Sequence, residues 1–150
     1  MITIGIRAAP RVVTFAVYDS DAQAVLNVEE IKIPAAFSKP EGLKYARSNL
    51  LDVLREYRVE RAGVRITEPN ADPNIDRVEL EGVIQEAFAS SNLVGYYVGQ
   101  IASISARVGI PKTAFKPYVE GEQNYPVDNW ADKSREKREA VLTALGAVDA

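Results

Sequence analysis

The first 18 residues constrain the fold of this chain more than any other stretch. Residues 2–7 read Ile-Thr-Ile-Gly-Ile-Arg, so isoleucine alternates with residues that are smaller or polar. Alternation of this kind is typical of a β-strand with one buried face. A short link containing Pro10 leads to a second apolar run over residues 12–18, and two such runs joined by a turn predict a β-hairpin. A hairpin this apolar is expected in the middle of a sheet, with Arg7 at the end of its first strand.

The composition fits a globular protein and removes several classes of chemistry. The chain has 150 residues, of which 47% are hydrophobic and 26% are charged, which predicts one domain over residues 1–150. It has no cysteine and no histidine, which excludes disulfides, thiolate or imidazole metal sites, and Ser-His or Cys-His catalysis. Any metal ion would need oxygen ligands. The net charge of −3 argues against nucleic-acid binding over the whole surface and leaves room for a local basic patch.

The sequence also predicts where the protein resides. No apolar run approaches the roughly 20 residues that cross a bilayer. The N-terminus enters a strand at once, without a basic segment or a cleavage site. We therefore expect a cytoplasmic protein with no membrane association.

The third strand is expected over residues 25–34, and its apolar residues change phase along its length. They fall at even positions in the first half (Leu26, Val28) and at odd positions in the second (Ile31, Ile33). A regular strand cannot direct all four side chains to one face, because successive side chains point to opposite faces. The sequence therefore predicts a β-bulge near Glu29-Glu30.

The remainder of the chain reads as alternating helices and strands. A helix opens at Ser38-Lys39-Pro40-Glu41, with a cap and an early proline, and its apolar stripe continues to Tyr57. Further elements are expected as a strand over 59–67, a helix over 75–88, a strand over 93–98, and helices over 100–108 and 133–148. Strands separated by helices of several turns pair in parallel. The predicted fold is α/β, a mixed five-stranded sheet made of an antiparallel three-strand meander plus two parallel strands, flanked by helices.

A tripeptide recurs in the two strands that are expected to be parallel neighbours. Gly5-Ile6-Arg7 and Gly63-Val64-Arg65 both place an arginine on the same face as a glycine two residues earlier. Because glycine leaves space on that face, another group can approach closely. Two neighbouring guanidinium groups need carboxylates or a bound anion. The favoured interpretation is pairing with protein acids such as Glu68, Glu136 or Glu139, and the alternative is a phosphate site.

Other charged and aromatic residues carry two interpretations each. Residues 132–138 contain four cations, which favours a solvated helix start with intrahelical ion pairs and leaves a phosphate-contacting patch with Lys112 and Lys116 as the alternative. The segment 112–130 contains four aromatic residues, which favours a surface loop held to the core by its rings and leaves stacking on nucleic-acid bases as the alternative. Glu68, just past a central strand, is a candidate metal ligand, although a two-metal site requires several converging acids.

The pattern resembles the RNase H-like superfamily and, within it, the compact RuvC-type resolvases. The resemblance covers nearly the whole chain and also extends to small bacterial proteins of that fold. It rests on the order of strands and on three stretches, Ile4-Gly5-Ile6-Arg7 with Arg11-Val12-Val13, Val59 to Arg65, and Tyr97 to Pro111. It implies an RNase H-like fold with a cleft derived from a nuclease active site.

The departures from the resolvase pattern bear on activity. Resolvases of this branch carry an aspartate where this chain has Arg7, and a glutamate where the ungapped match falls on Arg65, with Glu68 three residues on. The acid pair of their last helix has no Asp-x-x-Asp counterpart here, so Glu136 or Glu139 would have to stand in. Cations at two metal-binding positions would repel magnesium. The resemblance therefore argues against nuclease activity.

Three functional hypotheses follow from the sequence. The leading one is a catalytically degenerate domain without a cofactor that binds nucleic acid or a protein partner through Arg7, Arg65, Lys112 and Lys116. The second is a divergent nuclease that depends on Mg²⁺ or Mn²⁺ and uses Glu68, Glu136 and Glu139. The third is a structural subunit that makes no use of the cleft. The oligomeric state stays open.

Overall fold

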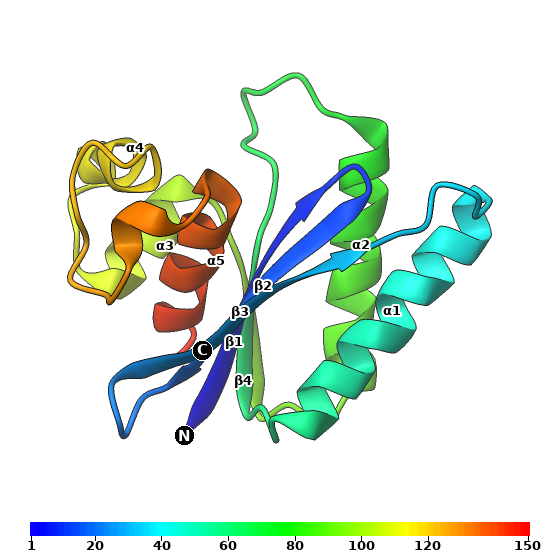
Figure 1. Ribbon diagram of the computed structural model, residues 1–150, viewed down its shortest axis with the longest axis horizontal. Coiled ribbons are helices and arrows are strands. Elements are labelled where there is room, and N and C mark those ends of the chain that lie inside the picture. The colour runs from blue at the N-terminus through cyan, green and yellow to red at the C-terminus, as the bar shows by residue number, and fades with distance from the viewer.

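The computed structural model describes residues 1–150 and shows a mixed five-stranded sheet covered by helices on both faces (Figure 1). The elements are β1 (Ile2–Ala9), β2 (Val12–Asp19), β3 (Ala24–Lys32), α1 (Lys39–Glu56), β4 (Arg61–Arg65), α2 (Ile75–Ser90), β5 (Gly95–Gly99), α3 (Ile101–Val108), α4 (Phe115–Val119) and α5 (Arg135–Leu145), with single 3₁₀ turns at Lys112–Ala114 and Trp130–Asp132. The strand order is β3-β2-β1-β4-β5. This order confirms the α/β fold predicted from the sequence.

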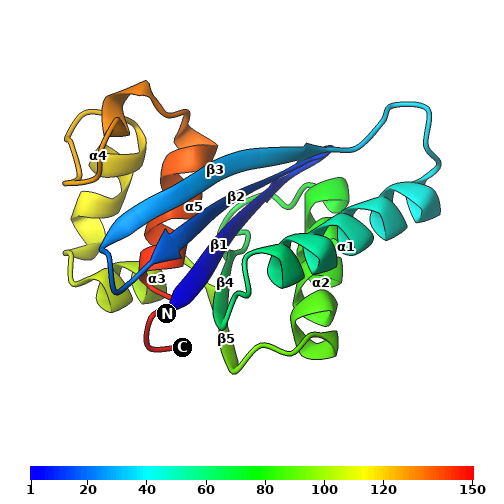
Figure 2. The same cartoon turned by 60° about the horizontal axis from the view of Figure 1, so that its bottom comes forward.

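The predicted meander and parallel strands are both present (Figure 2). β1 pairs with β2 and β2 with β3 in antiparallel fashion, whereas β1 pairs with β4 and β4 with β5 in parallel. The apolar β1 lies at the centre of the sheet, as its sequence predicts. The parallel strands are shorter than expected, because β4 spans only Arg61–Arg65 and the residues up to Thr67 continue as a loop.

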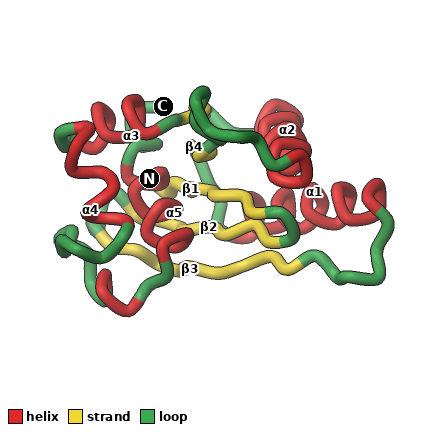
Figure 3. Tube along the Cα trace, turned by 90° about the horizontal axis from the view of Figure 1, so that it is seen from above, coloured by secondary structure: helices red, strands yellow, loops and turns green.

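The two faces of the sheet bury different helices. α1 and α2 cover one face, and α5 with α3 and α4 lies against the other, as the view from above also shows (Figures 1 and 3). The core on the first face includes Ile4, Ile6, Phe15 and Val64, and the core on the second includes Tyr97, Trp130 and Leu142. A sheet covered on both faces does not need its strands to alternate apolar and polar residues.

α5 packs directly on the backbone of β1 because Gly5 has no side chain. A Cβ atom built on Gly5 would lie only 2.1 Å from the carbonyl oxygen of Ala140 and the amide nitrogen of Ala144. On the neighbouring strand, a Cβ on Gly63 would lie 2.3 Å from the ring of Tyr97. The space predicted beside each Gly-x-Arg arginine is thus filled by α5 and by Tyr97, and this close packing sets how far α5 lies above the sheet.

The helix starts follow the expected capping chemistry. The Ser38 side chain accepts a hydrogen bond from the Glu41 amide, and the Glu41 carboxylate accepts one from the Ser38 amide, which forms a capping box with Pro40 in the first turn. Asn74 caps α2 and Ser134 caps α5, and each side chain accepts a single hydrogen bond from a backbone amide of the first turn. These local signals explain why the helix positions agree with the sequence.

The β-bulge prediction is wrong in its position. The register between β2 and β3 shifts between Val17 and Tyr18, where Leu26 is the extra residue on β3, rather than near Glu29-Glu30. Leu26 is exposed, Val28 packs on the α5 side, and Ile31 packs on the α1 side. The prediction assumed that all four apolar side chains point to one face, whereas both faces of β3 offer apolar contacts.

The segment between α3 and α5 was expected to be a surface loop, but it contains helical turns and makes many contacts with the core. Its predicted ring contacts exist, since Phe115 and Trp130 are buried and Tyr125 packs against the Trp130 ring, but it also contains α4 and two 3₁₀ turns. Arg138 donates hydrogen bonds to the carbonyl oxygens of Val119, Trp130 and Ala131. The expectation of a solvated helix start with intrahelical ion pairs therefore does not hold for Arg138.

No helix combines the length and the apolar character needed to cross a bilayer.

Candidate functional site

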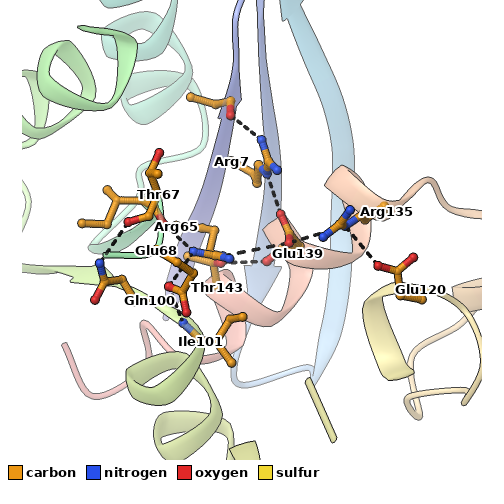
Figure 4. A network of polar contacts seen from close by, with 12 residues as sticks. Arg7, Arg65, Thr67, Glu68, Gln100, Ile101, Glu120, Arg135, Glu139 and Thr143 are labelled. Carbon is orange, nitrogen blue, oxygen red and sulfur yellow. Dashed lines mark hydrogen bonds and ion pairs between the residues drawn. The ribbon is translucent and has the colours of Figure 1, made fainter. Parts of the chain in front are cut away.

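Arg7 and Arg65 lie side by side at the carboxyl ends of two parallel strands. They are register partners across the β1–β4 pair, and both point toward α5 (Figure 4). Their side chains retain 12% and 6% of their exposure. Two guanidinium groups this deeply buried require negative charge nearby, because an unpaired buried charge is very costly.

Glu139 on α5 supplies most of that negative charge. Its carboxylate, only 1% exposed, accepts a hydrogen bond from Arg7 Nε at 2.5 Å. The same carboxylate lies 4.0 Å from Arg65 Nε and 3.9 Å from Nε of Arg135, one turn earlier on α5. Glu139 is thus a buried anion shared by three arginines, which agrees with the interpretation that the paired arginines meet protein acids.

Glu68 provides a second, weaker anion on the other side of Arg65. Its Oε2 atom accepts hydrogen bonds from Arg65 Nη1 at 3.2 Å and from the backbone amide of Ile101 at 3.3 Å. Arg65 Nη1 also donates to the carbonyl oxygen of Ile66, and its guanidinium carbon lies 5.7 Å from the centre of the Phe115 ring. Arg65 Nε is buried and has no hydrogen-bond partner.

A fourth arginine of this region was not identified from the sequence. Arg77, on the first turn of α2, donates to Glu81 at 2.9 Å, and Glu81 also accepts hydrogen bonds from the Thr67 amide and hydroxyl. Burial lowers the pKa of Arg77, and the positive charge of Arg7 lowers it further. The four-residue spacing of Arg77 and Glu81 is a visible helix ion-pair signal, but it gives no indication that the pair faces the sheet.

The four arginines and Glu68 line a cleft of about 860 Å³ between the loop after β4 and the start of α5. Two exposed lysines on the segment after α3, Lys112 and Lys116, lie on its rim and form no ion pair. The charged residues lining the cleft are six cations and one acid: Arg7, Arg65, Arg77, Lys112, Lys116, Arg135 and Glu68. The four arginines are paired with Glu139, Glu81, Glu68 or Glu120, whereas Lys112 and Lys116 leave their positive charge unpaired in a chain whose net charge is −3. Arg135 lies on this surface and also makes an intrahelical ion pair with Glu139, of the kind expected for the helix start.

The acidic residues do not assemble into a metal centre. Glu68 and Glu139 lie on opposite sides of Arg65, and each is engaged by arginine. Glu136 forms no ion pair or side-chain hydrogen bond and is not among the residues that line the cleft. No group of three acidic side chains converges in a way that suits a metal ion. The residues present at the ends of β1 and β4 thus do not fit the divalent ion that the resemblance implies.

Comparison with solved structures identifies the fold. Thermus thermophilus RuvC superposes with a TM-score of 0.75 at 15% sequence identity, covering 97% of this chain and 92% of that protein. The T. thermophilus RuvC in complex with a Holliday junction substrate gives 0.74 at 15% identity, with 97% and 91% covered. The fowlpox virus resolvase, in complex with Holliday junction DNA, gives 0.51 at 15% identity, with 98% and 93% covered.

The fold is therefore RNase H-like and of the RuvC type. No protein-family model matches the sequence, and no curated protein is detectably similar to it. At identities of this level the similarity establishes the fold, and the function has to be argued from the site itself.

Proposed function

We propose that this protein is a non-catalytic nucleic-acid-binding domain that holds the sugar-phosphate backbone in its arginine-lined cleft. The observation that carries the proposal is that six cations, including two lysines without an ion pair, surround one cleft in an acidic protein. Phosphate groups supply the dominant attraction in protein–nucleic acid binding, and arginine matches their geometry with paired donors. The RuvC and resolvase structures of this fold that were solved with Holliday junction DNA support nucleic acid as the ligand class.

The state of the acids supports binding without cleavage. A metal-dependent nuclease needs carboxylates that are free to coordinate divalent ions. Here Glu139 is buried and bonded to Arg7, and Glu68 is bonded to Arg65. Binding of a magnesium ion would require both ion pairs to break and would leave the two guanidinium groups next to a dication. The cleft therefore suits a polyanion far better than a metal ion.

Binding should be measured with labelled single-stranded, duplex and four-way-junction DNA in EDTA, over a range of salt concentrations. The double variant Lys112→Gln/Lys116→Gln removes two rim cations that form no ion pair in the fold. We expect it to weaken binding and to lower the slope of log affinity against log salt by about 0.7 for each lost contact with a single strand. Lys32→Gln/Lys44→Gln is the matched control, because both lysines are exposed and lie outside the cleft.

The same samples distinguish the other two functional classes. Cleavage in Mg²⁺ or Mn²⁺ that disappears in Glu68→Gln would identify a divergent nuclease and would contradict the proposal. Equal affinity for the cleft variant and its control would place any nucleic-acid contact elsewhere. Absence of binding to all three DNA forms would favour a protein partner or a structural role.

A further inference from the structure

Glu68 occupies a position that is built to bind an anion. Its Oε2 atom receives the Arg65 guanidinium from one side and the Ile101 amide from the other (Figure 4). Ile101 is the first residue of α3, so its N–H is one of the donors that a helix leaves unpaired at its N-terminus. A guanidinium and a helix N-terminal amide that converge on one oxygen form an arrangement that suits phosphate.

Arg65 is held in place independently of Glu68. Its Nη1 atom donates to the Ile66 carbonyl, its guanidinium carbon lies 5.7 Å from the centre of the Phe115 ring, and only 5% of the residue is exposed. Its Nε atom is buried without a partner. A buried donor without a partner costs about 1–3 kcal/mol. Arg65 is therefore fixed in position, with Nε 4.0 Å from the Glu139 carboxylate and Nη1 directed at Glu68.

Glu68, in contrast, is held loosely. Its two hydrogen bonds of 3.2 and 3.3 Å are longer than the roughly 2.7–2.9 Å of strong charge-assisted bonds, and its side chain is 26% exposed. The preceding residue, Thr67, is tied by Glu81 and by Gln100, whereas residues 69–73 form an exposed loop. Rotation of the Glu68 side chain alone would therefore free both donors without moving β4.

We propose that Arg65 and the Ile101 amide form a phosphate subsite and that Glu68 is its built-in competitor. A backbone phosphate of the bound nucleic acid displaces the carboxylate and takes over both hydrogen bonds. Glu68 then rotates into the open cleft. This inference rests on the proposed function for the identity of the ligand, whereas the subsite itself rests on the contacts of Arg65, Glu68 and Ile101.

The central test compares two variants that each remove one negative charge near the cleft. Glu68→Ala frees the subsite, whereas Glu120→Ala removes an exposed carboxylate that lies 3.6 Å from Arg135 and does not contact Arg65. We expect Glu68→Ala to raise the affinity for a labelled oligonucleotide about tenfold, because two donors no longer need to be vacated. Glu120→Ala should change the affinity less than about threefold, as expected for an exposed ion pair.

A third variant tests the contribution of the helix terminus. Proline is tolerated at the first position of a helix, and Gln100 has the extended backbone that precedes proline, with φ −114° and ψ 177°. Ile101→Pro in the Glu68→Ala background removes the amide donor and should cancel most of the gain in affinity. Thermal unfolding of this double variant checks that α3 is retained.

A second readout separates the subsite from the choice of ligand. In a ¹⁵N NMR titration with inorganic phosphate, the Ile101 amide should shift strongly in Glu68→Ala and weakly in the unmodified protein. If Glu68→Ala and Glu120→Ala raise oligonucleotide affinity equally, the subsite is wrong and the proposed function stands. If no DNA binds but phosphate shifts Ile101 in Glu68→Ala, the subsite is right and the proposed function fails. An unshifted Ile101 amide in that variant overturns the inference.

Discussion

Removal of the Glu139 carboxylate should be strongly destabilising. The carboxylate is 1% exposed and is the anion shared by Arg7 and Arg65, whose side chains retain 12% and 6% exposure. Glu139→Gln keeps the volume and one acceptor oxygen but leaves two buried guanidinium groups with Glu68 as their only nearby acid. Breaking a buried pair by removing one partner costs about 3–5 kcal/mol. Because glutamine still accepts a hydrogen bond, we expect a value at the lower end, about 3 kcal/mol.

Urea and thermal unfolding measure this loss directly. For a domain of this size, a change of 1 kcal/mol shifts Tm by about 2–4 °C, so Glu139→Gln should lower Tm by roughly 6–12 °C. Glu136→Gln is the matched control, since it makes the same substitution on the same helix at a residue without an ion pair, and it should cost less than about 0.5 kcal/mol. Similar Tm values for the two variants would refute the assignment of Glu139 as the anion that holds the arginine pair.

Two further predictions concern the packing of α5. Gly5→Ala should destabilise the fold by more than about 3 kcal/mol, because the added methyl group would lie 2.1 Å from the α5 backbone. The control Gly82→Ala on α2 should stabilise the fold by up to about 1 kcal/mol, because there the methyl group meets nothing within 4 Å. Chemical denaturation of the pair checks this, and equal effects would contradict it. The Tyr97 hydroxyl donates to the Thr143 carbonyl at 2.8 Å, and burial raises the pKa of Tyr97 well above its usual value. A raised tyrosine pKa favours the neutral form in the folded state, so this stabilisation is complete below about pH 10 and is lost as the pH rises further. Stability measured from pH 8 to 11 should fall more steeply for the unmodified protein than for Tyr97→Phe, and parallel curves would be inconsistent with a buried tyrosine proton.

Much of the fold could be predicted because its signals are local. The alternation in residues 2–7 defines β1, and the Ser38 capping box defines the start of α1. The adjacency of Arg7 and Arg65 followed from the repeated Gly-x-Arg pattern in two strands expected to be parallel. The same pattern also indicated the close approach that Gly5 allows.

What the sequence did not reveal depends on contacts between distant segments. No bulge is needed at Glu29-Glu30 because Val28 and Ile31 pack on opposite faces of the sheet, which cannot be inferred from β3 alone. Arg77 lies at the cleft where its partner Glu81 bonds to Thr67, in the loop after β4. Arg138 is withdrawn from solvent by carbonyl groups of Val119, Trp130 and Ala131, which are brought to it by tertiary packing.

The central claim is that guanidinium groups, rather than metal ions, meet phosphate in this cleft. The most direct test is a crystal structure of the protein with a short oligonucleotide in the presence of Mn²⁺, with anomalous scattering used to locate the metal. The account predicts backbone phosphates within hydrogen-bonding distance of Arg65 and the cleft lysines, Glu68 rotated away, and no manganese among the acids. A manganese ion coordinated by Glu68 and Glu139 would contradict it.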